Sequence, residues 1–110
     1  MKVGLLRCMQ TEDMCCATTD FMVIREKKCA FEGVEGEIEI IGINTCGGCP
    51  GKKAVTRALE MVKRGADTIA LGSCITKGNP IGFKCPHSQL IKEAITKKLG
   101  NDITILDYTH

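Results

Sequence analysis

Short continuous apolar runs take turns with helically spaced apolar residues along the chain, and this pattern predicts four strands and three helices. The apolar runs cover residues 1–6, 37–43, 68–71 and 103–106. Such runs are typical of buried strands, and the second suits a strand covered on both faces. Apolar residues recur at helical spacing over 21–31, 50–64 and 88–99, and glycine follows each of these segments. Polar residues 18–20 and 88 are expected to cap the first and third helices.

Strands and helices alternate in the order βαβαβαβ, so a helix connects each strand to the next. Connections of this kind join parallel strands and place helices on both faces of the sheet. We therefore predict a three-layer α/β fold of the Rossmann-like or flavodoxin-like kind, built on a four-stranded parallel sheet. The chain has 110 residues, 44% of them hydrophobic, so residues 1–110 are expected to form a single domain.

The charged residues give no sign of a nucleic-acid or membrane partner. Fifteen Lys and Arg against thirteen Asp and Glu leave a formal net charge of +2, and the two signs are mixed rather than gathered in a basic stripe. No stretch approaches the roughly 18 apolar residues of a membrane helix, and residues 1–10 lack a signal-peptide cleavage site. We expect a soluble cytoplasmic protein, in which the eight cysteines are metal ligands or redox groups rather than a disulfide framework.

Most of the cysteines and both histidines fall at the ends of predicted strands or in the loops beyond them. Cys8 follows the first strand, Cys46 and Cys49 follow the second, and Cys74 follows the third. Because parallel strands end at one edge of the sheet, where ligands bind in such folds, these thiols are expected to meet there. Thiolates and imidazoles are ligands of zinc and of iron–sulfur clusters. The candidate metal ligands are Cys8, Cys15, Cys46, Cys49, Cys74, Cys85, His87 and His110.

The Cys46-Gly47-Gly48-Cys49 segment is the most specific local motif. Its two-residue spacer lets both sulfurs face one ion, and the N-terminus of the following helix favours thiolates. Nearby lysines would add positive charge; they are Lys52, Lys53, Lys77 and Lys84. A phosphate-binding loop is disfavoured, because Cys46 and Lys53 stand where that loop needs glycine and Ser or Thr. A cysteine phosphatase loop is disfavoured too, because no arginine stands six residues after either cysteine.

Four of the candidate ligands have a plainer structural explanation. Cys8 and Cys74 can be small buried core residues, since free cysteine is often fully buried. Cys85 and His87 can instead belong to a turn that caps the third helix. Packing alone explains Cys46 and Cys49 less well, because two glycines separate them.

The remaining cysteines and the last histidine are harder to place. Cys15 and Cys16 lie in the predicted loop over residues 10–18, which can fold back over the site so that one of them binds. His110 ends the sequence, where fraying is common. Cys29 falls inside the predicted first helix, and we expect it to be a core residue.

Together, the cysteine motifs and the end of the chain resemble the CGGC-domain family of small bacterial and archaeal proteins. The residues that carry the resemblance are Cys46-Gly47-Gly48-Cys49-Pro50-Gly51, Ser73-Cys74, Cys85-Pro86-His87 and Thr109-His110. The resemblance runs nearly end to end and includes Cys8 and Cys15, whereas the doubled Cys15-Cys16 and residues 78–84 stand outside its pattern. Membership implies metal binding, with zinc suggested, and implies no enzyme activity.

Three functions remain open at this point. The first is a protein that binds zinc, an iron–sulfur cluster or a metal that it passes on, since the candidates exceed the four ligands of tetrahedral zinc. The second is a thiol–disulfide redox enzyme, with Cys46 attacking if the turn exposes it and Cys49 resolving the mixed disulfide. The third is a partner-binding module whose metal only holds loops in place. A protein redox or metal-transfer partner fits the first two, and the oligomeric state stays open.

Overall fold

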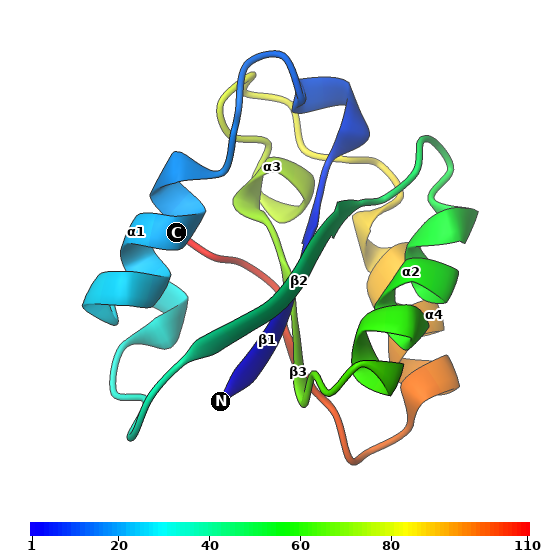
Figure 1. Cartoon of the computed structure of the whole chain (residues 1–110). Helices are drawn as coiled ribbons and strands as arrows, with labels where there is room; N and C mark the ends of the chain where they lie inside the picture. Colours follow the sequence, from blue (N-terminus) through cyan, green and yellow to red (C-terminus); the bar gives the residue numbers. More distant parts are fainter.

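The computed structural model describes residues 1–110 and shows a three-layer α/β fold (Figure 1). One parallel sheet has the strand order β2-β1-β3-β4. Helix α1 lies on one face, and α2 and α4 lie on the other, which confirms the predicted fold. The strands are β1 (Lys2–Arg7), β2 (Glu39–Thr45), β3 (Thr68–Leu71) and β4 (Thr104–Leu106). The helices are α1 (Thr18–Glu26), α2 (Lys52–Lys63), α3 (Ser73–Thr76) and α4 (Ser88–Leu99), with short 3₁₀ helices η1 (Met9–Thr11) and η2 (Cys29–Phe31).

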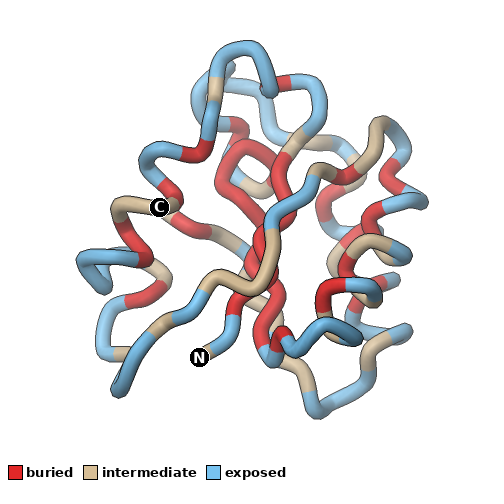
Figure 2. Tube along the Cα trace, viewed as in Figure 1, coloured by how far each residue is buried: buried red, intermediate tan, exposed pale blue.

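The sheet separates two hydrophobic clusters, and the buried residues concentrate along its central strands (Figure 2). Leu5 of β1 packs with Val23 and Ile24 of α1 on one face. Leu6 packs with Ala58 of α2 and Ile95 of α4 on the other. Because successive side chains of a strand point to opposite faces, the odd-numbered residues of β1 face α1.

Strand β2 lies at the edge of the sheet, and the prediction that it is buried on both faces was wrong. It pairs only with β1, from Glu39 to Thr45. All its residues are exposed or half-buried, and Ile43 keeps 44% of its surface exposed. An apolar run identifies a strand but leaves its position in the sheet undetermined.

The first helix begins and ends earlier than predicted. Ala17 has a left-handed φ of 69° and directly precedes α1, so residues 18–20 form the first turn instead of capping it. Lys27 also has a left-handed φ, of 54°, and its N–H closes the last turn of the helix. Cys29 therefore lies beyond the helix in η2 and is exposed, so the prediction of a buried, helical Cys29 was wrong.

The other differences are local. Helix α2 begins at Lys52, after Pro50, and α4 begins at Ser88, so that His87 and not Ser88 occupies the N-cap position. Residues 73–76, predicted as loop, form α3. No helix has both the length and the apolar character needed to cross a bilayer.

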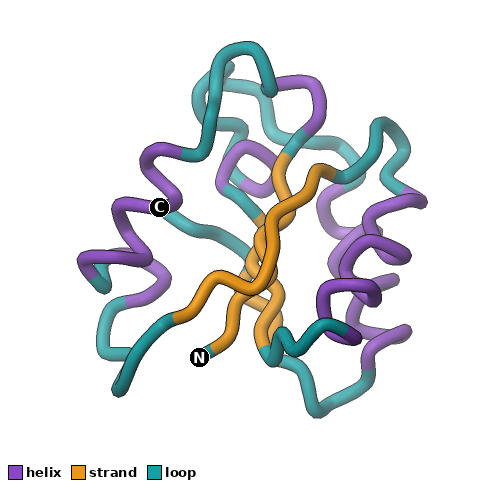
Figure 3. Tube along the Cα trace, in the orientation of Figure 1, coloured by secondary structure: helices purple, strands orange, loops and turns teal.

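The loops after β1, β2 and β3 lie together at one end of the sheet, at the top of Figure 3. We use the name rim for the part of this end that carries Cys8, the CGGC turn, Cys74 and Cys85; it comprises residues 8–11, 46–51, 72–77 and 85–86.

Candidate functional site

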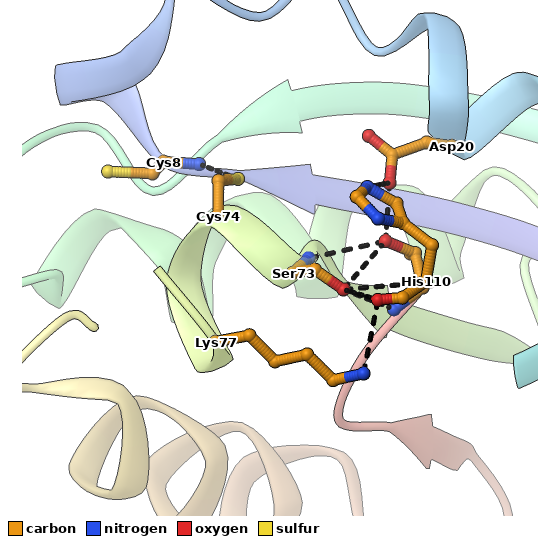
Figure 4. A network of polar contacts seen from close by, with 7 residues as sticks. Cys8, Asp20, Ser73, Cys74, Lys77 and His110 are labelled. Carbon is orange, nitrogen blue, oxygen red and sulfur yellow. Dashed lines mark hydrogen bonds and ion pairs between the residues drawn. The ribbon is translucent and has the colours of Figure 1, made fainter. Parts of the chain in front are cut away.

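Hydrogen bonds join the strand ends at the rim. The Cys46 N–H donates to the carbonyl of Arg7 at 2.8 Å. The Cys8 N–H donates to Cys74 Sγ at 3.2 Å (Figure 4). Cys8 therefore lies between the CGGC turn on one side and Cys74 on the other.

The long loop brings Cys85 to the same end of the molecule. The Cys85 N–H donates to the carbonyl of Ile75 at 3.0 Å, and its side chain packs against the core cluster that contains Cys46. Burial raises the pKa of the Cys85 thiol, and the nearby Cys49, Cys8 and Cys46 thiols raise it further. The rim thus gathers five of the predicted ligands, the rim cysteines Cys8, Cys46, Cys49, Cys74 and Cys85.

The rim cysteines lie near one another, but their side chains are not arranged to bind one metal ion. Nowhere in residues 1–110 do three or more His, Cys, Asp or Glu side chains converge closely enough to hold a metal ion. Burial also raises the pKa of the Cys74 thiol, although hydrogen bonds from the Cys8 N–H and the Thr11 hydroxyl oppose the increase. These two thiols, Cys74 and Cys85, are therefore protonated at neutral pH and would have to lose protons to bind metal.

The CGGC turn depends on its glycines. Gly47 and Gly48 have φ values of 78° and 104°, which side chains rarely adopt. A Cβ at Gly47 would lie 2.6 Å from Cβ of Lys53, so no other residue fits without displacing α2. The turn leaves Cys46 only 7% exposed while Cys49 is exposed. The accessible thiol of the pair is therefore Cys49, and the condition under which Cys46 was expected to attack, exposure by the turn, is not met.

His87 is close to the rim cysteines. It is half-buried at the start of α4, and its N–H donates to Cys85 Sγ at 3.4 Å. Lys77 does not reach the thiols, because its Nζ donates to the carbonyl of His110 at 3.1 Å and lies 4.5 Å from the centre of the Tyr108 ring.

Cys15, Cys16 and His110 lie elsewhere. Together with Cys74 they line a pocket of about 180 Å³ beside α1, which we call the α1 pocket. No residue of the CGGC turn lines it. The structure therefore separates two predicted ligands, Cys15 and His110, from most of the rim cysteines.

A buried polar network fixes the C-terminal residues against the α1 pocket (Figure 4). Asp20 is 2% exposed; it accepts a hydrogen bond from the Thr109 hydroxyl, and its Oδ1 lies 3.6 Å from Nε2 of His110. Ser73 Oγ accepts hydrogen bonds from the N–H groups of Thr109, at 3.1 Å, and His110, at 2.9 Å. Asp20 was predicted as a helix cap and Ser73 was noted only beside Cys74, because nothing in the sequence indicates that these two polar side chains are buried together.

Cys16 differs from the buried thiols. Its Sγ lies 3.1 Å from the Thr18 hydroxyl. That hydroxyl and the Thr18 N–H lower the pKa of Cys16, and the positive charge of Arg7 lowers it slightly more. Arg7 is itself only 8% exposed, and its Nε and Nη2 have no hydrogen-bond partner. Arg7 was also missed, because nothing in the sequence marks it as buried.

The chain matches one family model and is similar to a protein of another organism. The family model described as "CGGC domain" matches residues 2–110. The chain is similar to "Uncharacterized protein MJ0582" of Methanocaldococcus jannaschii, with 32% identity over 111 residues, covering 96% of this chain and 81% of that protein. No solved structure matches the chain. The abundance of cysteines in such a domain suggests metal binding without indicating which metal. The match over nearly the whole length shows that the chain belongs to the CGGC domain family.

Proposed function

We propose that this single domain binds zinc or an iron–sulfur cluster at the rim. The proposed ligands are the rim cysteines, assisted by His87. The observation that carries the proposal is that two hydrogen bonds join the strand ends around Cys8. The Cys8 N–H donates to Cys74 Sγ, and the Cys46 N–H donates to the carbonyl of Arg7. Thiols from three strand ends and one loop thereby surround a single end of the sheet.

The residues at the rim fit such a group. Thiolates with one imidazole are the ligands that zinc and iron–sulfur clusters take in proteins. The absence of a side chain at Gly72 also leaves room beside the sulfur, because a Cβ there would lie 3.1 Å from Cys74 Sγ. The surplus over four ligands favours a carrier that hands its metal to a protein partner in the cytoplasm.

Metal binding would require the rim thiols to move closer together than they are in the structure. The thiols need rotations about χ1 to converge, which a cysteine side chain makes at low cost on an already ordered backbone. Each ligand must also be a thiolate. Because burial raises the pKa of Cys74 and Cys85, binding releases protons and strengthens as the pH rises.

Metal analysis of protein purified without oxygen tests the proposal. We expect stoichiometric zinc in a colourless protein, or iron and sulfide in a brown one. Cys74→Ser and Cys85→Ser should bind much less metal than the parent, whereas Cys29→Ser is the matched control, since Cys29 is exposed and lies outside the rim.

The same variants separate metal binding from the alternative redox function of the CGGC turn. A redox pair needs only Cys46 and Cys49. If the Cys74 and Cys85 variants hold as much metal as Cys29→Ser does, the rim is not the metal site.

A further inference from the structure

The α1 pocket contains reactive groups that a metal site at the CGGC turn does not use. Cys15 and Cys16 line it together with Met14, and Cys74, which is also a proposed metal ligand, forms the side that it shares with the rim. The buried Asp20 and its partner His110 form another part of the wall. Sulfur on several sides of one small cavity is a setting for thiol chemistry.

Cys16 occupies the most reactive position in this pocket. It is exposed and precedes Ala17, whose left-handed conformation brings the chain into α1. Its Sγ lies 3.1 Å from the Thr18 hydroxyl, in the first residue of α1. The sulfur therefore sits over the first turn of a nine-residue helix, where N–H groups and the helix dipole stabilise a thiolate.

Arg7 lies on the same side of the sheet as the α1 pocket, although it is not one of the residues that line the pocket. As an odd-numbered residue of β1 it faces α1, and it is only 8% exposed. Its Nε and Nη2 have no hydrogen-bond partner, and it forms no salt bridge. A buried cation without a partner is unfavourable unless an anion lies nearby. A thiolate at Cys16, on the same side of the sheet, would supply negative charge there.

We propose that the α1 pocket is a thiol–disulfide exchange site for low-molecular-weight disulfides, with Cys16 as the attacking residue. The Cys16 thiolate attacks one sulfur of the disulfide, so that a new S–S bond forms and the old one breaks. The leaving thiolate keeps the electron pair of the broken bond and takes a proton from water. A second small thiol then attacks the mixed disulfide and releases Cys16, so the protein undergoes no net oxidation.

Other reactions of a thiolate fit the pocket less well. A phosphate ester would need an accessible clamp, but Nε and Nη2 of Arg7 have almost no exposed surface. Acyl transfer would need an imidazole paired with the thiol, but the hydrogen-bond partner of Cys16 Sγ is the Thr18 hydroxyl and not His110. The volume of about 180 Å³ accommodates one arm of a small disulfide. The reaction needs no metal and so stands apart from the proposed function.

Peptide mass spectrometry tests the proposal on the reduced, metal-free full chain. The protein is incubated with bis(2-hydroxyethyl) disulfide and quenched with an alkylating agent over time. We expect the adduct at Cys16 to form about tenfold faster than at Cys29, which is also exposed and serves as an internal control. Arg7→Met should slow the Cys16 adduct several-fold and leave Cys29 unchanged.

Two further variants keep the result interpretable. Arg57→Met is the matched control, because Arg57 lies beside the CGGC turn and hydrogen-bonds Thr45 and Asn44; it should not alter the Cys16 rate. Thr18→Ala replaces Arg7→Met if the latter fails to fold, and should also slow Cys16. The proposal is overturned if Cys16 reacts no faster than Cys29, if Cys15 or Cys49 takes most of the adduct, or if Thr18→Ala has no effect.

Discussion

Cys46 and Cys85 pack on the side of the sheet that α2 and α4 cover, the α1 pocket lies on the other side, and the two regions surround their thiols differently. At the CGGC side, Cys46 and Cys85 pack with the apolar core, and burial raises the pKa of Cys85. In the α1 pocket, Cys16 is exposed to water, and hydrogen bonds lower its pKa. The pKa shifts of the two thiols therefore have opposite signs. The region around Cys85 suits a thiol that loses its proton on binding metal, and the region around Cys16 suits a thiolate that attacks directly.

Removing cysteines from one region at a time should have the largest effect. We expect Cys46→Ser with Cys85→Ser to weaken zinc binding by more than about 100-fold, because loss of ligands exceeds the 10- to 100-fold effects of their outer-shell partners. Cys15→Ser with Cys16→Ser should change it less than about threefold. Competition with a chromophoric chelator measures both. Equal losses in the two double variants would show that one site spans both regions.

The buried carboxylate of the α1 pocket should matter for stability more than any exposed one. Asp20→Ala leaves the Thr109 hydroxyl without its acceptor, so the free energy of unfolding should fall by about 2 to 3 kcal/mol. Asp107→Ala is the control. Asp107 forms an exposed ion pair with Lys92, whose loss should cost less than about 1 kcal/mol. Urea unfolding gives both values, and a similar loss in the two variants would contradict the structural role of Asp20.

The close approach of the CGGC turn to α2 can be tested with a single methyl group. Gly47→Ala should lower the free energy of unfolding by about 1 to 3 kcal/mol, because the new Cβ would lie 2.6 Å from Lys53 Cβ at a positive φ. Gly36→Ala has nearly the same φ, 77°, but open space around it. It should therefore cost about 1 kcal/mol or less. If Gly36→Ala costs as much, conformation and not contact explains Gly47.

The smallest expected effect is a loss of stability of the metal-free protein at alkaline pH. The Cys74 thiol has a folded pKa above its ordinary value of 9.0. Its stabilising contribution is therefore complete below 9.0 and is lost as the pH rises through the folded pKa. Urea unfolding at about pH 8 and about pH 10 should show a decline that is weaker in Cys74→Ser than in Cys29→Ser. A decline of equal size in both variants would assign it to other groups.

Most of the fold follows from local patterns. The apolar run over residues 68–71 and the helical spacing before Gly65 predict β3 and α2 closely. The errors occur where backbone conformation overrides composition, as at Ala17 and Lys27, whose positive φ values set the limits of α1. An alanine or a lysine in a sequence does not predict a left-handed conformation, because positive φ is uncommon for both residue types.

The position of the rim could be predicted because the carboxyl ends of all strands in a parallel sheet lie at the same edge. That argument carries Cys8, Cys46 and Cys74, which each follow a strand. It misplaces His110, which follows the last strand but pairs with Asp20 of α1. It also overlooks Arg7, whose charge is hidden inside an otherwise apolar face.

The sequence by itself determined the layers, because periodicity and connection order leave few ways to arrange alternating strands and helices, and its cysteine motifs indicated the family. Only the tertiary structure decided which thiols are buried, which lie beside a charge, and that Cys15 and His110 belong with α1. Burial and electrostatic environment depend on contacts between residues far apart in the chain, such as Asp20 and Thr109, and these contacts leave no local pattern to recognise.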